Sequence, residues 1–107
     1  MYYYMHISLN FEKDEIPHIT PAFFKENIIR SVRTIFGEYA CNADIDILKY
    51  NPRNLNAILR VPEHLYVKIH ASLTFCGSWQ GRPCYYTVHK VSPLLLSISH
   101  DSRNYEH

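Results

Sequence analysis

The sequence predicts an α+β fold in which two helices cover one face of a four-stranded antiparallel sheet, in the order β-α-β-β-α-β. Residues 2–11 and 54–61 alternate apolar and polar side chains, as strands with one buried face do. Two further segments carry apolar residues at helical spacing, each between a proline and a glycine. A chain of 107 residues is long enough for one such domain, which we expect to cover 1–107 with a polar tail from about residue 100.

The first strand and the first helix have clear boundaries in the sequence. The strand runs from Tyr2 to Phe11, and its apolar face carries Tyr3, Met5, Ile7, Leu9 and Phe11. Its other face carries Tyr4, His6, Ser8 and Asn10. Thr20 and Pro21 form an N-cap and a first-turn proline, and Gly37 ends the helix. The predicted buried stripe of this helix consists of Phe24, Ile28, Val32, Ile35 and Phe36.

The second and third strands are predicted to form a hairpin. The second strand covers Asp44 to Tyr50, with Ile45 and Ile47 on one face, and the turn Asn-Pro-Arg-Asn follows it directly. The apolar face of the third strand consists of Leu55, Ala57, Leu59 and Val61. Its opposite face consists of Asn54, Asn56, Ile58 and Arg60.

The second helix is predicted between Pro62 and Gly77, with the glycine as a left-handed C-cap. Its core stripe consists of Leu65, Ile69, Leu73 and Cys76. The fourth strand covers Pro83 to Val91, and the segment 93–98 is either a short terminal helix or a continued strand. Since β-α-β connections are right-handed, these elements build a ferredoxin-like sandwich with the first and third strands in the centre.

Composition narrows the classes of function. Hydrophobic residues make up 47% of the chain and the net charge is +1, which indicates a folded domain and argues against an independent, strongly basic nucleic-acid binder. The cysteines Cys41, Cys76 and Cys84 are odd in number and show no CxxC spacing. With no signal peptide and no apolar run of membrane length, we expect an intracellular, reducing compartment and no membrane contact.

Motifs for catalysis, cofactors and metals are missing. The chain has three isolated glycines, so there is no glycine-rich phosphate loop, and its seven histidines are scattered. Cys76 and Cys84 have no partner pair for zinc. The loop after the first strand, Glu12-Lys13-Asp14-Glu15, is acidic and would repel an anion. We therefore expect no catalytic residue, no metal and no cofactor.

The generic RNA-recognition domain has the same topology, so a stand-alone RNA-binding module is one function to consider. Such domains stack bases on aromatic residues of the first and third strands. Here the first strand offers Tyr4, and the third strand offers no aromatic residue on that face. A small-molecule-binding domain of the same topology is a second alternative. Among the dispersed basic residues, Arg30, Arg33 and Arg53 are the candidates for phosphate contact.

Two apolar surfaces exceed what the core of such a sandwich requires. Val67, Ala71 and Phe75 form a second stripe on the second helix, away from its core stripe. The terminal residues Leu94, Leu95 and Leu96 cannot all point into one small core. Both surfaces are predicted to form an interface with a partner chain. The alternative is that the terminal leucines fold back onto the second helix and satisfy both surfaces.

Several segments together resemble a family of eukaryotic ribonuclease P protein subunits, which holds the fourteen-kilodalton subunit and the related Pop-five subunit. The matching segments are YYYMHISLNF, RTIFGE, DIDILKYN, NLNAILRV, ASLTFCGSWQGRPC and VSPLLLSISHDSR. Where the Pop-five branch has a glycine-rich turn, this chain has Val91-Ser92-Pro93-Leu94, which favours the fourteen-kilodalton branch.

The resemblance implies a non-catalytic scaffold subunit. In ribonuclease P the RNA subunit removes the 5′ leader of precursor transfer RNA, and related subunits are shared with ribonuclease MRP. The implied partners are a Pop-five-like subunit, thirty-kilodalton and forty-kilodalton subunits, and the ribonuclease P RNA through limited or indirect contact. The implied location is the nucleus and nucleolus.

Overall fold

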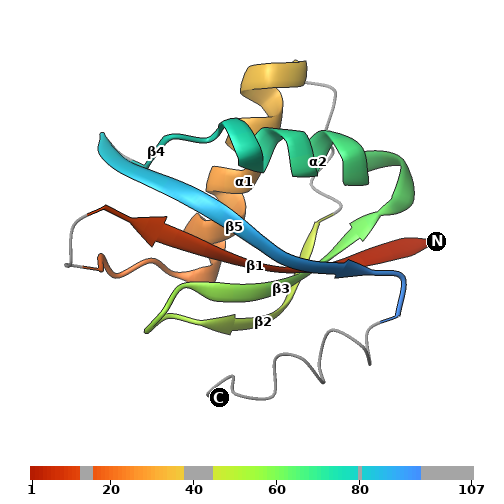
Figure 1. Ribbon diagram of the computed structural model, residues 1–107, viewed down its shortest axis with the longest axis horizontal. Coiled ribbons are helices and arrows are strands. Elements are labelled where there is room, and N and C mark those ends of the chain that lie inside the picture. The colour runs from red at the N-terminus through yellow and green to blue at the C-terminus, as the bar shows by residue number, and fades with distance from the viewer. Residues whose placement is uncertain (13–15, 38–44, 80, 95–107) are drawn as a thin grey trace.

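The fold is a helix-on-sheet sandwich, and the computed structural model describes residues 1–12, 16–37, 45–79 and 81–94 (Figure 1). Its elements are β1 (Tyr2–Phe11), α1 (Pro21–Phe36), β2 (Asp46–Asn51), β3 (Asn56–Pro62), α2 (Glu63–Phe75), β4 (Ser78–Trp79) and β5 (Arg82–Ser92). The predicted order β-α-β-β-α-β is confirmed. The short strand β4 is an addition, because it lies in the segment that the sequence predicted as a loop.

The sheet has the strand order β2-β3-β1-β5-β4, so the first and third strands are central within the four main strands, as predicted. β1 pairs antiparallel with β3 and with β5, and Ile7 lies opposite Ala57 on one side and Val88 on the other. A bulge shifts the register between His6 and Ile7 in the pairing with β5. The predicted hairpin of β2 and β3 is confirmed.

The core lies between the sheet and the two helices, which cover the same face (Figure 1). The predicted apolar faces supply most of it: the buried residues include Met5, Ile7, Leu9, Phe24, Ile28, Val32, Leu55, Ala57, Leu59, Val61, Leu65, Ile69 and Leu73. Phe24 packs edge-on against Tyr50 and Tyr86, at ring-centroid distances of 5.1 and 6.1 Å. Ile58, on the opposite face of β3, is fully buried too, so that face is not wholly exposed to solvent.

The caps of α1 follow the prediction. Thr20 has an extended backbone, and its hydroxyl accepts a hydrogen bond from the Phe23 N–H at 3.3 Å. Pro21 is the first helical residue. Gly37 has φ 96°, a value that favours glycine, and its N–H donates to the Arg33 carbonyl at 2.9 Å. The sequence therefore fixes both ends of this helix locally.

The predicted core stripe of α1 is wrong in its last turn. Ile35 and Phe36 are 41% and 42% exposed, whereas Asn27 and Ile29 are buried. Figure 1 shows the reason, since the C-terminal turn of α1 projects past α2 and away from the sheet. The apolar periodicity of the helix continues beyond the surface that could cover it.

The predicted left-handed cap at Gly77 is also wrong. The C-cap of α2 is Cys76, which has an extended backbone (φ −72°, ψ 119°), and Gly77 is not among the residues with positive φ. The chain passes directly into β4, and the Gly77 carbonyl accepts a hydrogen bond from the Cys84 N–H at 3.1 Å. Pairing with β5 therefore determines the backbone here. Pro62 ends β3 and serves as the N-cap of α2, one position before the helix begins.

Within the described segments, no helix is long and apolar enough to cross a membrane. The predicted terminal element 93–98 lies mostly outside the described residues. Only its beginning is visible, where the Ser92 hydroxyl accepts a hydrogen bond from the Leu94 N–H at 3.0 Å.

Candidate protein and RNA contact surfaces

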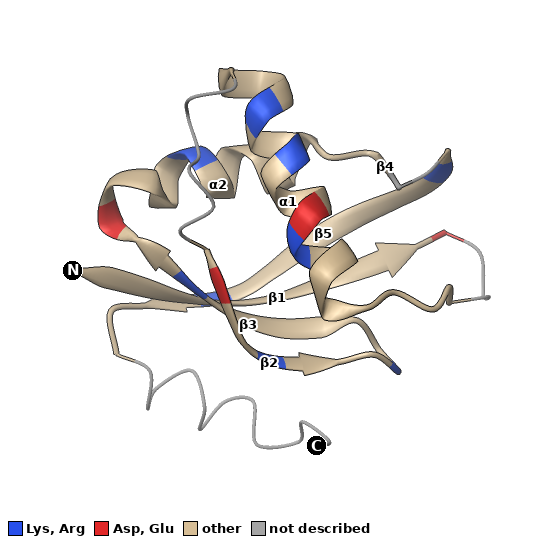
Figure 2. Ribbon diagram, turned by 180° about the vertical axis from the view of Figure 1, so that it is seen from behind, with Lys and Arg blue, Asp and Glu red and all other residues tan. Residues whose placement is uncertain are grey.

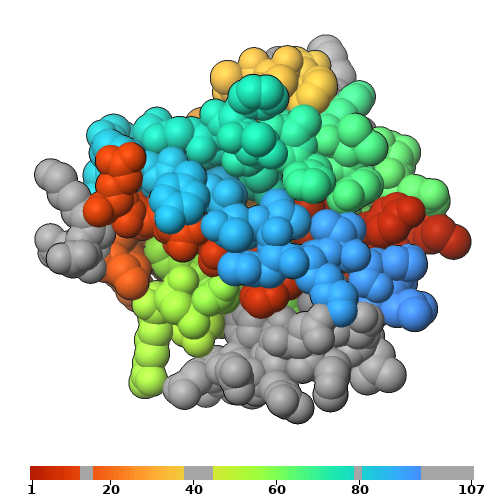
Figure 3. Space-filling model, viewed as in Figure 1, coloured from red at the N-terminus to blue at the C-terminus, as the bar shows by residue number. Residues whose placement is uncertain are grey.

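The outer side of α2 carries an uncovered apolar stripe. Val67 and Phe75 are 70% and 75% exposed, and Ala71 between them is partly exposed. Their spacing of four residues places them on one side of the helix, while Leu65, Ile69 and Leu73 face the core on the other. Figure 3 views the molecule from the side on which α2 and β5 lie in front. The stripe that the sequence indicated is therefore on the surface.

The terminal leucines are described only at their beginning. Leu94 is 66% exposed, and Leu95 and Leu96 lie outside the described residues. Val67 and Phe75 remain exposed in the described structure. Whether Leu95 and Leu96 belong to the same surface therefore stays a prediction.

Beside this stripe runs a shallow groove of about 380 Å³, lined by Tyr66, Val67, His70, Ala71 and Thr74. The Tyr66 ring lies 4.9 Å from the Tyr3 ring of β1, and its hydroxyl is 3.4 Å from Nδ1 of His70. One edge of the groove is thus held by contacts with the sheet and within the helix. Its other edge is the exposed Val67.

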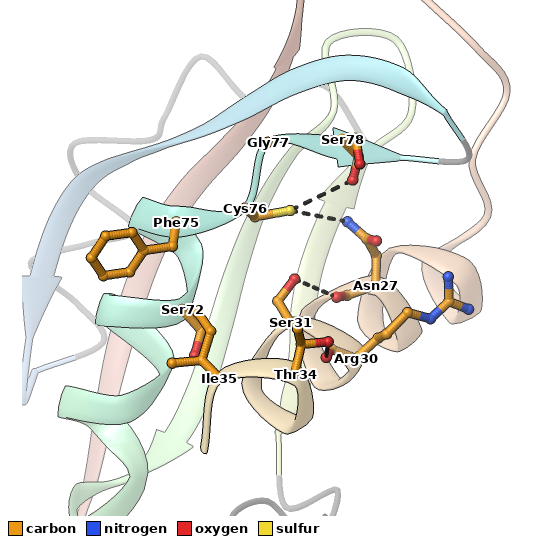
Figure 4. A pocket seen from close by; sticks show the side chains of 10 residues that line it. All are labelled: Asn27, Arg30, Ser31, Thr34, Ile35, Ser72, Phe75, Cys76, Gly77 and Ser78. Atoms are coloured by element: carbon orange, nitrogen blue, oxygen red, sulfur yellow. Dashed lines mark hydrogen bonds between the residues drawn. The ribbon is translucent and has the colours of Figure 1, made fainter. Parts of the chain in front are cut away.

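A second groove, of about 310 Å³, separates the C-terminal halves of α1 and α2 (Figure 4). Its lining consists of Asn27, Arg30, Ser31, Thr34, Ile35, Ser72, Phe75, Cys76, Gly77 and Ser78. Sequence reasoning missed this site because it assigned Ile35 to the core. No local signal pointed to the groove, because the apolar stripe of α1 does not show where the surface that covers it ends.

The base of this second groove is a buried polar contact. The Asn27 Nδ2 donates to the Tyr86 hydroxyl at 2.7 Å and lies 4.0 Å from the Cys76 sulfur. Burial raises the pKa of the Cys84 thiol to about 11, and the neighbouring Cys76 thiol adds to this. Cys84 is therefore a neutral, buried thiol at physiological pH, as expected of a structural cysteine.

The candidate phosphate contacts fall into two places. Arg30 and Arg33 are exposed on neighbouring turns of α1, and Arg53 is exposed in the turn between β2 and β3. Figure 2 shows basic positions along α1 and on the β2–β3 hairpin, seen from one side. The structure thus brings Arg30 and Arg33 together and leaves Arg53 on a separate element.

Another arginine is already engaged within the fold. Both Nε and Nη2 of Arg60 donate to Oδ2 of Asp46, at 3.2 and 2.7 Å, and the guanidinium lies 5.0 Å from the Tyr2 ring centroid. The hydrogen bond to Asp46 raises the pKa of Arg60. Arg60 therefore links β2 and β3 and is a poor candidate for phosphate contact.

The sheet face away from the helices is mostly polar. The His6 and His89 rings lie 4.6 Å apart, His89 Nε2 forms a hydrogen bond with the Ser8 hydroxyl at 2.9 Å, and Asn10 Nδ2 donates to the Thr87 hydroxyl at 2.9 Å. Tyr4 is partly buried, and β3 presents no aromatic ring on this face. This arrangement lacks the paired aromatic platform of an RNA-recognition domain.

The described side chains that could bind a metal ion lie in pairs at most, such as His6 with His89. Among the described residues, no three of His, Cys, Asp and Glu lie close enough together to hold a metal ion. The described residues thus offer apolar and basic surfaces as the candidate sites.

Comparisons with known proteins identify the family of this chain. The Rpp14/Pop5 family matches residues 2–98. The human protein "Ribonuclease P protein subunit p14" is 39% identical over 102 residues, which cover 95% of this chain and 82% of the human one. The mouse protein of that name is 35% identical over 102 residues, with 95% and 83% covered.

A solved structure shares the fold. A chain of the yeast ribonuclease MRP structure determined by cryo-electron microscopy superposes with a TM-score of 0.68, covering 96% of this chain and 89% of that one at 13% sequence identity. At that identity the match supports the fold, whereas the family is established by the match over residues 2–98 and by the similarity to the mammalian proteins. This chain belongs to the Rpp14/Pop5 family.

Proposed function

We propose that this protein is a non-catalytic subunit of a ribonuclease P ribonucleoprotein and acts in the removal of 5′ leaders from precursor transfer RNA. The observation that carries the proposal is the similarity, over 95% of the chain, to mammalian proteins named as ribonuclease P subunits. A shared role in ribonuclease MRP, and a location in the nucleus and nucleolus, belong to the same proposal.

The role is that of a scaffold. The described side chains form no cluster suited to metal binding, and the exposed features are apolar stripes and dispersed arginines. Such features serve assembly. In this proposal the RNA subunit carries out the cleavage, and the protein holds neighbouring subunits in place.

The protein partners bind at the outer side of α2 and at the end of β5. Val67, Ala71 and Phe75 form the α2 part, and Leu94 continues from β5, followed in the sequence by Leu95 and Leu96. Burying one large apolar side chain contributes roughly 1.5–3 kcal/mol, so a few such residues dominate a docking interface. The proposed partners are a Pop-five-like subunit and the thirty-kilodalton and forty-kilodalton subunits.

Direct RNA contact is limited in this proposal. Arg33 and Arg53 contact phosphate, each adding one increment to the affinity. Arg30 differs from them because it lines the groove between the helices.

Affinity purification of the tagged full-length chain from cells tests the function. We expect ribonuclease P RNA to be enriched over total RNA, together with protein subunits of that complex. Enrichment of diverse messenger RNAs would instead identify an RNA-recognition module, and recovery of neither RNA nor protein subunits would contradict the proposal.

A further inference from the structure

The groove between α1 and α2 combines apolar edges with one charged group. Ile35 and Phe75 line it and are 41% and 75% exposed, so the groove has an uncovered hydrophobic side chain on each helix (Figure 4). The volume of about 310 Å³ is at the lower end of ligand pockets. It therefore suits a protruding side chain rather than a whole folded element.

The three hydroxyl groups that the helices contribute to the groove each donate a hydrogen bond to their own helix. Ser31 donates to the Asn27 carbonyl at 2.9 Å, Thr34 to the Arg30 carbonyl at 2.8 Å and Ser72 to the Lys68 carbonyl at 2.7 Å. Their protons are thus unavailable to a ligand. Arg30 is the single charged residue of the lining, and within the described part of the chain it forms no ion pair.

The two helix ends beside the groove differ in how they are compensated. Arg33 lies in the last turn of α1, and Gly37 donates its N–H to that turn. α2 has no basic residue in its last turn, and its C-cap Cys76 is extended. The carbonyl end of α2 therefore keeps a negative partial charge, which attracts N–H donors and repels phosphate. A polypeptide supplies such donors, whereas a phosphodiester backbone does not.

We propose that this groove binds a polypeptide segment of a partner subunit, which inserts an apolar side chain between Ile35 and Phe75 and pairs a carboxylate with Arg30. The apolar edges, the single cation and the uncompensated carbonyl end are each complementary to such a segment. The proposal rests on the proposed function for the existence of a partner subunit. It assigns Arg30 to protein recognition and leaves phosphate contact to Arg33 and Arg53.

Site-specific crosslinking in the assembled complex tests this assignment. The full-length chain is expressed in cells with p-benzoyl-phenylalanine in place of Ile35 or, separately, of Phe75. The matched control carries it in place of Phe23, which is 58% exposed on α1 and outside the groove lining. We expect the probe at position 35 or 75 to crosslink to one polypeptide segment, which holds an aspartate or glutamate within about one helical turn of an apolar residue. The probe at position 23 should give at least tenfold less crosslinked product.

Charge reversal gives the second measurement. In the Ile35-substituted chain, Arg30→Glu should lower the yield of this crosslink at least tenfold, and Arg30→Lys should lower it less. Arg33→Glu should change it by less than twofold, although it makes the same charge change one turn away. Circular dichroism of each purified variant checks that the fold is retained.

Several outcomes would overturn the inference. The probe could crosslink to RNA, to a second copy of this chain or to a segment without an acidic residue. The crosslink yields from positions 23 and 35 could be equal, or Arg30→Glu could leave the crosslink yield unchanged. Recovery of ribonuclease P RNA with the tagged chain is measured in the same samples. The inference can therefore fail while the proposed function holds, and the two failures are distinguishable.

Discussion

The Asn27 side chain on α1 donates a hydrogen bond to the Tyr86 hydroxyl on β5 across 2.7 Å. Both residues are buried, with 6% and 8% of their surface exposed. Burial raises the pKa of Tyr86, so its hydroxyl is neutral at physiological pH and accepts this bond. Because Asn27 also approaches the sulfur of Cys76, the contact joins α1, the end of α2 and β5 beneath the groove.

Breaking this contact should destabilise the fold. Asn27→Ala removes the donor and leaves a buried hydroxyl without it, so we expect a loss of about 1–3 kcal/mol in the free energy of unfolding. Urea denaturation measures the loss. Ser31→Ala, one turn away, should cost much less, because its hydroxyl bonds only to its own helix.

A double-mutant cycle identifies the cause. Tyr86→Phe should cost less in the Asn27→Ala background than in the unchanged protein, since the bond is already absent there. Equal costs in both backgrounds would show that the two residues contribute independently, and the loss in Asn27→Ala would then come from packing alone.

Local patterns in the sequence predicted most of the fold. The alternation in 2–11 predicted the face of β1 that carries Met5 and Ile7, and Thr20 with Pro21 predicted the start of α1, because these signals depend on neighbouring residues alone. The central position of β1 and β3 followed from the handedness of the connections.

The errors lie where tertiary contacts decide. Ile35 continues the apolar stripe of α1, but nothing in that stripe reveals where the covering sheet ends. Gly77 follows a helix, but its backbone is set by pairing with Cys84 across the β4–β5 hairpin, whose first strand lies in a segment that the sequence predicted as a loop. Asn27 was not predicted in the core, because a polar residue is buried only when a distant partner such as Tyr86 satisfies it.

The candidate site was predicted in part. The exposed stripe of Val67 and Phe75 was visible as apolar residues on two sides of one helix. The groove between α1 and α2 was not, since it requires the relative placement of two helices that no local pattern encodes. Which partner occupies either surface stays a prediction.

The N-cap of α1 should contribute measurably to stability. Thr20→Ala removes the acceptor of the Phe23 N–H and should cost about 1 kcal/mol, whereas Thr20→Ser retains an acceptor and should cost less. Chemical denaturation compares the variants. Thr34→Ala on the exposed side of the same helix is the matched control and should be near neutral. Equal losses at positions 20 and 34 would contradict a capping role.

Stability should fall in alkaline solution. Burial raises the pKa of the Cys84 thiol from 9.0 to about 11 and that of the Tyr50 hydroxyl from 10.0 to about 12. The unfolded chain therefore releases these protons at lower pH than the folded chain does, and ionisation favours unfolding. The contribution of the neutral groups is complete below pH 9 and is lost as pH rises toward 12.

Denaturant titrations at several pH values measure this loss. Cys84→Ala should reduce the slope of stability against pH between 9 and 11, because the buried thiol then no longer titrates. Tyr85→Phe, which changes an exposed tyrosine next to it, should leave the slope unchanged. An unaltered slope in Cys84→Ala would mean that other groups cause the alkaline loss.

The α2 stripe should matter for assembly and not for folding. Phe75 is 75% exposed, so Phe75→Asp should leave the thermal midpoint of the isolated chain within a few degrees. If a partner buries this ring, the change should weaken association by roughly 1.5–3 kcal/mol or more, which corresponds to about a tenfold to hundredfold loss. Quantitative co-purification with other subunits measures this loss of association. Phe23→Asp is the control, and similar losses from both variants would argue against a specific interface at α2.

Arg33 and Arg53 should make contributions to RNA affinity that depend on salt. Each phosphate contact releases counterions, so Arg33→Ala or Arg53→Ala should lower the slope of log affinity against log salt by roughly one unit. RNA binding by the assembled subcomplex, measured between about 50 and 200 mM salt, gives the slope. Lys68→Ala on α2 removes an exposed cation outside this set and should leave the slope unchanged.

The two arginines lie on separate elements, so their effects on RNA affinity should add. A loss of equal size at every salt concentration would place the arginine in a protein contact or in the fold, because only displaced counterions make the affinity depend on salt in this way.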